Sequence, residues 1–550
     1  MGTNRNYLFI SDLHLSEGRS PLTGKTSPTE DFFQDEAFAH FIVYQVNQSL
    51  SLTNPACYRR PWTLVVNGDL FDFLQVASLP AEGLELQQAT GKATYKELSK
   101  NEQRYGLGTT ERETVWKLGR IHQGHPLFFQ ALAWFLAHPN HELVIMKGNH
   151  DVELFWPGVQ KALRAQLQAA YSAWRAQASQ GCPPLSPLPL HNRLLTSLDD
   201  LETRVLFPEW FLHEPGLFFA EHGNQYDPFN DFDDFLKPIL PSDQNLPEAQ
   251  QRINAPAGSL VVRYFFNKLE QVHPFADNLK PLTRYLNYAL NKDLGTTLRI
   301  GLSTPTTLPR TIWNLLRKRW RDSFGAEAQA RRQIKAAARP AVPHSGAPGK
   351  VLADSLRAIQ RNFGRRSWRT IALSIGSIVI TLLLRLGMIA LLFLSIRPLL
   401  TEQYGLFFLR LAAAGLLWLL RAAFSSAADN LGEAISLRRA AEEVCQLLNQ
   451  SAMNGRPAGV RYHLYGHDHH ADLVEIGDKA AGQPRQWYVN TGCWLPTLSE
   501  YDRLTRGEVQ LTFFRIIPDL DDTDDGLPAL MQWQAEVNEP RPLRLFDGKR

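Results

Sequence analysis

Five short motifs rich in Asp, Asn and His lie along this chain between residues 12 and 469. They are Asp12-Leu13-His14, Gly68-Asp69-Leu70-Phe71-Asp72, Gly148-Asn149-His150-Asp151, His222-Gly223 and Gly466-His467-Asp468-His469. Carboxylate, amide and imidazole groups are ligands that Mn, Fe and Zn accept, and no thiolate takes part. A single motif of this kind is more often a turn or a helix cap than a ligand. The occurrence of all five together therefore predicts a metal site.

Strand-like runs accompany the motifs. Three motifs directly follow the apolar runs Tyr7–Ile10, Trp62–Val66 and Leu143–Met146. Such runs predict buried strands, and ligands collect at the carboxyl ends of strands in α/β sheets. The same criterion predicts strands at Arg204–Phe207, Leu217–Ala220, Val460–Tyr465, Gln486–Asn490 and Val509–Ile517, and helices at Val159–Ala178 and Ala427–Asn449. The fold class expected is α/β.

The order and spacing of the motifs resemble the calcineurin-like metallophosphoesterase family, and all five of its sequence blocks have a counterpart here. The resemblance implies a four-layer α/β/β/α double-sheet fold over residues 5–230 and 455–518. Within the family, Phe9-Ile10-Ser11-Asp12-Leu13-His14-Leu15-Ser16 and Gly68–Asp72 look like the UDP-2,3-diacylglucosamine pyrophosphatases. The chain departs from that branch at His150, where those enzymes usually carry Arg, and in its length and apolar segments.

The resemblance also implies roles for individual residues around two divalent metal ions, Mn, Fe or Zn. It assigns one ion to Asp12, His14 and His469 and the other to Asn149, His222 and His467. Asp69 would bridge the two ions, and a hydroxide shared between them would be the nucleophile. His150 would protonate the leaving group, since its imidazole titrates near neutral pH.

Three aspartates near the motifs have two interpretations each. Asp151 or Asp72 would orient a histidine ligand, as metal-bound imidazoles usually require, and Asp151 joins His150 as a candidate catalytic residue. Either aspartate could equally cap the following helix. Asp227 is a candidate for supporting a ligand or binding substrate, or it forms a turn before Pro228.

The function expected is two-metal-dependent hydrolysis of a phosphomonoester, phosphodiester or pyrophosphate, on a membrane-proximal or lipid-linked substrate. One alternative is a non-catalytic, membrane-tethered regulator on the same fold, although the intact ligand set argues against it. The other is a nuclease of the same family that uses a basic segment to contact the phosphate backbone.

Length, cysteine content and the N-terminal residues limit the kind of protein to expect. A chain of 550 residues predicts several structural units, and its four cysteines are widely spaced. That spacing argues against a disulfide framework and against a cysteine-ligated metal. The N-terminal residues show no signal-peptide pattern, so we expect a cytoplasmic catalytic domain. His122, His125, His138 and His141 cluster in sequence without carboxylates at ligand spacing, and we expect them at the surface or at helix ends.

An apolar region interrupts the motif-bearing parts of the chain. Residues 231–369 predict a helical insertion and a linker, in which Arg310–Arg369 holds fifteen Lys or Arg and three acids. Within residues 370–424, the segments Ile371–Ile396 and Tyr404–Leu420 carry one charge each, Arg385 and Arg410. The first is long enough to span a bilayer, and its basic flank suits the cytoplasmic side of a membrane.

Topology limits how such segments cross a membrane. Expected ligands precede and follow the apolar region, so the chain must cross an even number of times or not at all. The sequence therefore predicts a two-helix transmembrane hairpin and a membrane-associated protein. A re-entrant or interfacial hairpin and a soluble helix pair remain as alternatives, because a central arginine costs roughly 2.5–3.5 kcal/mol on insertion scales.

Overall fold

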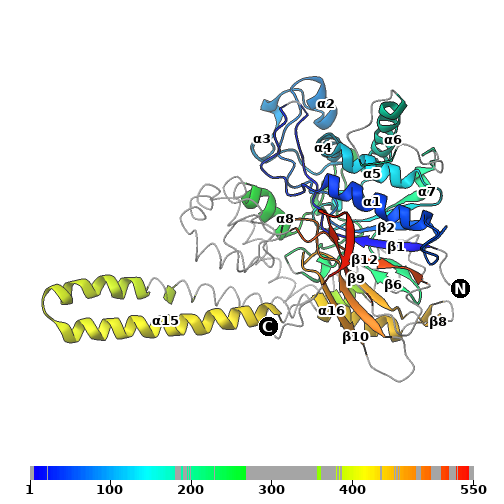
Figure 1. Ribbon diagram of the computed structural model, residues 1–550. Coiled ribbons are helices and arrows are strands. Elements are labelled where there is room, and N and C mark those ends of the chain that lie inside the picture. The colour runs from blue at the N-terminus through cyan, green and yellow to red at the C-terminus, as the bar shows by residue number, and fades with distance from the viewer. Residues whose placement is uncertain are drawn as a thin grey trace.

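The fold is mixed α/β, as expected, with two β-sheets and helices around them (Figure 1). The computed structural model describes residues 5–21, 23–179, 187–189, 195, 197–198, 200–227, 229–267, 356–360, 380, 383–384, 387–433, 437–450, 452–453, 456–457, 459–477, 485–496, 509–518, 528 and 530–543. All structural statements below concern these residues.

A seven-stranded sheet contains the first three motif-bearing strands. Its order is β14-β13-β12-β1-β2-β3-β4, and its strands are β1 (Asn6–Ile10), β2 (Trp62–Asn67), β3 (Glu142–Met146), β4 (Val205–Leu206), β12 (Thr512–Ile516), β13 (Leu530–Gln534) and β14 (Glu539–Pro542). Strands β1 to β4 are parallel, whereas β12 to β14 are antiparallel. The carboxyl ends of β1, β2 and β3 therefore meet at one edge.

A five-stranded sheet contains the other two motif-bearing strands. Its order is β10-β11-β9-β6-β5, and its strands are β5 (Leu212–Glu214), β6 (Phe218–Ala220), β9 (Tyr462–Tyr465), β10 (Asp472–Ile476) and β11 (Gln486–Asn490). Strands β6, β9 and β11 are parallel. A separate pair is formed by β7 (Ala452–Met453) and β8 (Arg456–Pro457).

Helices fill the connections between the strands. They are α1 (Asp35–Leu50), α2 (Leu84–Thr90), α3 (Lys100–Tyr105), α4 (Glu111–Gly124), α5 (Pro126–Leu136), α6 (Pro157–Ser179), α7 (Leu201–Arg204), α8 (Ala257–Val261), α15 (Tyr404–Glu433) and α16 (Leu437–Gln450), with the short helices η1 (Tyr95–Glu97), η2 (Val152–Phe155), η3 (Asn224–Tyr226), η4 (Pro241–Asp243), η5 (Glu248–Gln250) and η6 (Val262–Phe266). Local sequence explains several starts. Thr110 and Glu113 form a capping box at α4, and Pro126 occupies the first turn of α5, where its missing N–H costs nothing.

Two apolar cores hold these layers together. One lies between the sheets and combines Phe9, Val65 and Met146 of the first sheet with Phe218 and Leu464 of the second. The other covers the outer faces, where helices such as α1, α5, α6 and α16 pack. Central parallel strands are buried on both faces, which is why their sequences are continuous apolar runs.

The strand predictions are confirmed to within a few residues, and the sheets are larger than expected. Every predicted run contains a strand of the structure. Strands β5 and β10 were not predicted, and β13 and β14 extend the first sheet beyond residue 518. The helix expected at Ala427–Asn449 is divided between α15 and α16.

The apolar region contains two helices. Residues 387–400 and α15 are helical and joined by the turn at residues 401–403. Much of Ile371–Ile396, including Arg385, and nearly all of Arg310–Arg369 lie outside the described residues. No helix in the described part of the chain is both long enough and apolar enough to cross a membrane.

The four histidines that cluster in sequence between residues 122 and 141 lie at or near helix ends, as expected, but most of them are not at the surface. His125, His138 and His141 are buried. His125 donates to two carboxylates: its Nε2 lies 3.2 Å from Glu30 and its Nδ1 3.1 Å from Asp35. Burial opposes the charge on His125, but the two carboxylates outweigh it and raise its pKa to about 10. The pattern missed this because Glu30, in the loop before α1, and Asp35, in the first turn of α1, are distant from His125 in sequence.

We expect the ion pairs of His125 with Glu30 and Asp35 to stabilise the fold in a pH-dependent way. The folded-state pKa is raised, so their contribution is complete below pH 6.5 and is lost as the pH rises toward 10. The His125→Gln substitution should therefore lower the free energy of unfolding by less at pH 10 than at pH 6.5. The difference between the two losses should be about 2–4 kcal/mol, since one pKa unit corresponds to about 1.4 kcal/mol. Urea unfolding at several pH values measures it.

His138→Gln is the matched control. Burial lowers the pKa of His138 to about 4, so this histidine does not change its charge between pH 6.5 and 10. Its stability difference from wild type should be constant over the interval. A constant difference for His125→Gln as well would contradict the ion-pair interpretation.

Candidate metal centre

All five motifs directly follow strands, and the loops that carry them meet where the two sheets adjoin. The first three follow β1, β2 and β3, and the last two follow β6 and β9. Backbone hydrogen bonds join neighbouring loops within each sheet. Gly466 donates to His222 O at 3.0 Å, and Leu13 and His14 both donate to Asp69 O. Parallel pairing thus brings residues separated by hundreds of positions to one edge.

The backbone at this edge is held in an unusual conformation. Ten non-glycine residues in the described part of the chain have positive φ, and half of them are expected ligands: Asp12, His14, Asp69, His467 and His469. Such a conformation costs on the order of 1–3 kcal/mol per residue and persists only where the surroundings enforce it. It clusters at functional sites, and its concentration here supports one.

The expected ligands form adjoining donor groups. Their nitrogen and oxygen atoms lie within 4.8 Å of one another in three sets: Asp12, His14 and His469; His14, Asp69 and His150; and Asp69, His222 and His467. Asp69 Oδ2 lies 3.1 Å from His222 Nε2 and 3.6 Å from His14 Nε2. Asp69 therefore lies between two clusters, as expected of a bridging carboxylate.

Several donor atoms at the centre lack a hydrogen bond. Among the described residues, Asp12 Oδ1, His14 Nε2 and Asn149 Oδ1 are buried without one. An unsatisfied buried polar atom costs about 1–3 kcal/mol. Cations in contact with these atoms would satisfy them, so the donor set fits divalent metal ions of the N- and O-preferring kind.

The electrostatics of the centre favour positive charge. Burial opposes ionisation of Asp12 and Asp69, but the neighbouring imidazoles outweigh it and hold the pKa of both carboxyls well below the usual range. Burial lowers the pKa of His222, yet Asp69 raises it to about 9. A field that stabilises protonated imidazole would also stabilise a divalent cation, and metal binding would displace the protons.

Hydrogen bonds orient the histidines. His222 Nδ1 donates to Asn67 O at 2.8 Å, which turns its Nε2 toward Asp69. Asp72 Oδ2 contacts Nδ1 of both His14, at 3.4 Å, and His150, at 2.5 Å. These contacts are of the kind that set the tautomer and ring orientation of metal-binding imidazoles. The orienting role considered for Asp72 or Asp151 therefore belongs to Asp72.

Asp151 has a different position from that expected of a catalytic group. Its carboxylate accepts hydrogen bonds from the amides of Gly148 at 2.6 Å, Leu70 at 2.8 Å and Phe71 at 3.3 Å. Burial and the charge of Asp69 raise its pKa to about 7. The side chain therefore joins the loops after β2 and β3.

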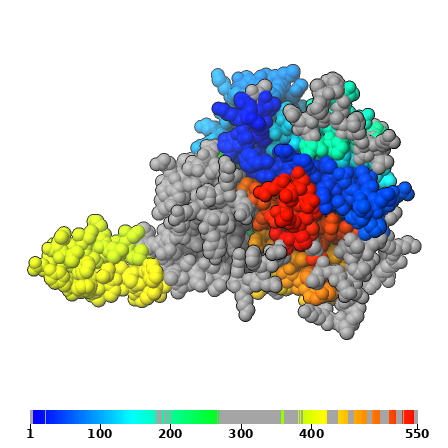
Figure 2. All heavy atoms as spheres, in the orientation of Figure 1, coloured from blue at the N-terminus to red at the C-terminus, as the bar shows by residue number. Residues whose placement is uncertain are grey.

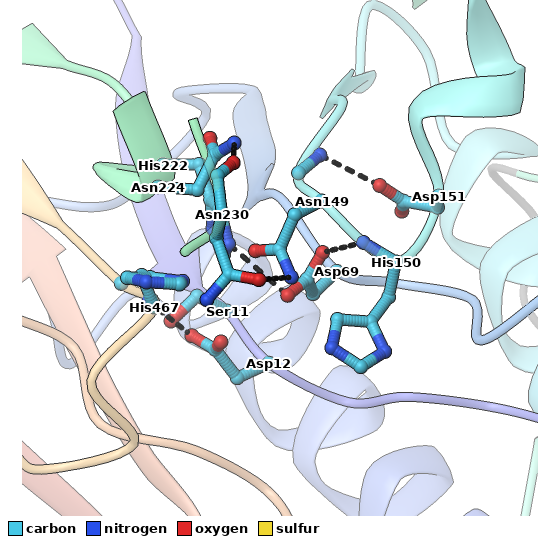
Figure 3. A network of polar contacts seen from close by, with 12 residues as sticks. Ser11, Asp12, Asp69, Asn149, His150, Asp151, His222, Asn224, Asn230 and His467 are labelled. Carbon is cyan, nitrogen blue, oxygen red and sulfur yellow. Dashed lines mark hydrogen bonds and ion pairs between the residues drawn. The ribbon is translucent and has the colours of Figure 1, made fainter. Parts of the chain in front are cut away.

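A chain of polar contacts supports the second cluster, and Figure 3 shows its link between Asn149 and Asn230. Asp227 Oδ2 contacts His467 Nε2 at 3.1 Å and accepts from Asn230 Nδ2 at 2.7 Å. Asn230 Oδ1 in turn accepts from Asn149 Nδ2 at 3.4 Å, which directs the other end of that amide, Oδ1, to the centre. Asp227 therefore both forms the turn and orients a histidine.

Sequence reasoning missed two residues of this support, Asn230 and Ser259. Ser259 Oγ donates to Asn149 O at 3.1 Å. Asn230 lies seven residues after the His222-Gly223 motif and Ser259 lies in α8 of the insertion, and neither belongs to a recognisable motif. Single polar residues carry no periodicity or spacing signal, so only the tertiary contact identifies them.

Comparisons with known proteins do not add to this picture. The chain was compared with protein-family models, with curated proteins and with solved structures, and no match was found. Any inference about function therefore rests on the motifs and on the geometry of the centre.

Asp69→Asn should reduce metal content. The substitution removes the negative charge shared by the two clusters, and we expect a loss of at least one bound ion and a weakening of metal affinity of roughly 10–100-fold or more, the scale seen for residues around metal sites. Metal analysis and calorimetric titration with Mn²⁺ measure it. Asp233→Asn, at an exposed position, is the control, and equal metal content in the two variants would contradict the bridge.

Gly148→Ala should have a similar effect without removing any donor. A Cβ at Gly148 would lie 2.1 Å from Asp69 Oδ1, so the carboxylate must move out of place. A Cβ at Gly119 would meet nothing within 4 Å, and Gly119→Ala in helix α4 should stabilise the fold by about 0.5–1 kcal/mol. Metal titration of both alanine variants makes the test, and wild-type affinity in Gly148→Ala would show that Asp69 can move freely.

Proposed function

We propose that this chain is a two-metal-dependent hydrolase of phosphoester or pyrophosphate bonds. The observation that carries the proposal is the position of Asp69, which belongs to two adjoining donor groups at once. A carboxylate can give one oxygen to each of two ions about 3.5–4 Å apart, and such a pair suits in-line displacement at phosphorus. Nitrogen and oxygen donors without thiolate agree with this chemistry.

The proposal includes the fold family. Two packed sheets with helices outside them, and ligands at the ends of β1, β2, β3, β6 and β9, are what a calcineurin-like double-sheet metallophosphoesterase would require. The motif order in the sequence and the convergence of the loops in space support the same assignment. They are separate observations, because motif order alone does not bring residues together.

In the proposed reaction, the oxygen of water attacks phosphorus while the bond from phosphorus to the leaving oxygen breaks. Metal ions, when bound, lower the pKa of water and neutralise phosphate charge. Asp12, Asp69 and Asn149 supply the oxygen donors, and the oriented imidazoles supply the nitrogen donors. The low exposure of the donors, at most 4 % for any of them, keeps bulk water from weakening these interactions.

His150 is the proposed proton donor to the leaving oxygen. Its Nδ1 is held by Asp72 Oδ2 at 2.5 Å, so Nε2 is the nitrogen that presents a proton. Asp72 would fix the orientation of the ring, as a buried aspartate does for a catalytic histidine in other hydrolases. His150 also lies within ligand distance of Asp69 and His14, so its role must be separated from that of a metal ligand.

His150→Ala separates the two roles. We expect both ions to stay bound and kcat to fall by roughly 10²–10⁴-fold, the usual scale for loss of a general acid. Metal analysis and steady-state kinetics on the same preparation measure it, with His40→Ala on α1 as the control. Loss of one ion from His150→Ala would identify the side chain as a ligand.

A substrate panel tests the function itself. It comprises p-nitrophenyl phosphate, bis-p-nitrophenyl phosphate, a nucleotide-diphosphate lipid and single-stranded DNA. We expect hydrolysis of at least one phosphoester or pyrophosphate, lost with a chelator and restored by Mn²⁺. Preference for DNA would make the protein a nuclease, and no turnover by a protein with two bound ions would favour a metal-stabilised regulator.

A further inference from the structure

The two helices of the apolar region form a hairpin that projects from the sheets and their helices (Figures 1 and 2). It consists of residues 387–400, the turn at residues 401–403 and the first part of α15, and we call it the apolar hairpin. The helices are antiparallel and in contact. A Cβ at Gly387 would lie 3.2 Å from Leu417 Cδ1, and Arg410 donates to the carbonyl of Leu394 across the hairpin.

The distribution of apolar side chains in this hairpin is the reverse of that in a water-soluble helical hairpin. Large apolar side chains face outward: Phe393 is 72 % exposed, Leu400 77 % and Leu409 66 %. The buried positions between the helices hold small residues, with Ser395 at 3 % exposure and Ala414 at 4 %. Small residues at the helix contact and large apolar residues outside are the arrangement of helices surrounded by lipid.

The exposed apolar residues surround the helices. On the first helix, Leu392, Phe393, Leu394 and Ile396 are all exposed, and at about 100° per residue they point in widely different directions. A protein partner or a second copy would cover one stripe of a helix. Lipid chains can cover every side, so the distribution favours lipid over a protein.

The charge pattern of the sequence agrees with an anionic membrane. Arg361, Arg365, Arg366 and Arg369 precede the apolar region in the sequence, and basic residues beside an apolar segment favour an anionic lipid surface. The guanidinium of Arg410 is bonded to a backbone carbonyl, which lessens the cost of placing it among apolar groups. The turn contains Thr401 and Glu402, polar residues that suit a hydrated environment.

We propose that the apolar hairpin embeds this protein in an anionic phospholipid membrane. The hairpin contains none of the proposed metal ligands, so this inference is independent of the hydrolase proposal. A membrane-bound protein without activity, and an active protein that does not bind lipid, would be distinct results.

Flotation of the full chain with vesicles tests the proposal. We expect wild type to float with vesicles of phosphatidylcholine and phosphatidylglycerol, and less with phosphatidylcholine alone. The double variant Phe393→Glu with Leu409→Glu places charges on both helices, and its vesicle binding should fall at least 10-fold. A circular dichroism spectrum and an unfolding temperature equal to those of wild type will show that the sheets remain folded.

The matched control places the same charges elsewhere. Leu52 and Leu84 are exposed to 76 % and 71 % and lie outside the hairpin, so Leu52→Glu with Leu84→Glu should float like wild type. Equal loss in both double variants would overturn the proposal, as would a wild type that stays at the bottom of the gradient. If such a wild-type protein sediments as an oligomer and its hairpin variant as a monomer, a second copy of the chain covers the apolar hairpin.

Discussion

The carboxylate of Asp69 is the group on which the rest of the centre depends. It is fully buried, accepts the amide of His150 at 2.8 Å and contacts His222 Nε2 at 3.1 Å. A buried carboxylate is costly unless positive charge surrounds it, so the loops after β1, β3 and β6 must bring the imidazoles of His14, His150 and His222 to it. The left-handed backbone at the expected ligands and the close approach of Gly148 are consequences of packing these loops around one group.

Strand pairing explains how a large insertion leaves this centre intact. Strands β6 and β9 are parallel neighbours, with Phe219 opposite His463, although more than two hundred residues separate them in sequence. The insertion leaves after β6 and returns before β9, and the backbone hydrogen bonds hold its two ends in register. Its first part contacts the centre through Asn230 and Ser259, whereas the apolar hairpin lies away from it.

Much of the fold and of the candidate site was predictable, for definite physical reasons. Parallel strands buried on both faces must be apolar throughout, so β1, β2 and β3 were visible in the sequence. Metal-binding groups belong to few residue types, so Asp12, His14 and His467 were visible as well. Strands β13 and β14, the last two at one end of the first sheet, were not predicted, because short strands of mixed polarity resemble loops. Asn230 was missed because its contact with Asn149 joins residues 81 positions apart.

The sequence by itself determined the class of the fold, the chemical identity of the donors and the apolar character of the hairpin, because these depend on residue type and local order. Tertiary structure alone decided how the donors are used. It placed Asp69 between two clusters. It also brought Asp72 into contact with the imidazoles of His14 and His150, which it orients, and made Asp151 a link between loops. It also turned the large side chains of the hairpin outward. Hydrogen-bond partners and burial are properties of three-dimensional proximity, which strand pairing creates and a linear pattern does not contain.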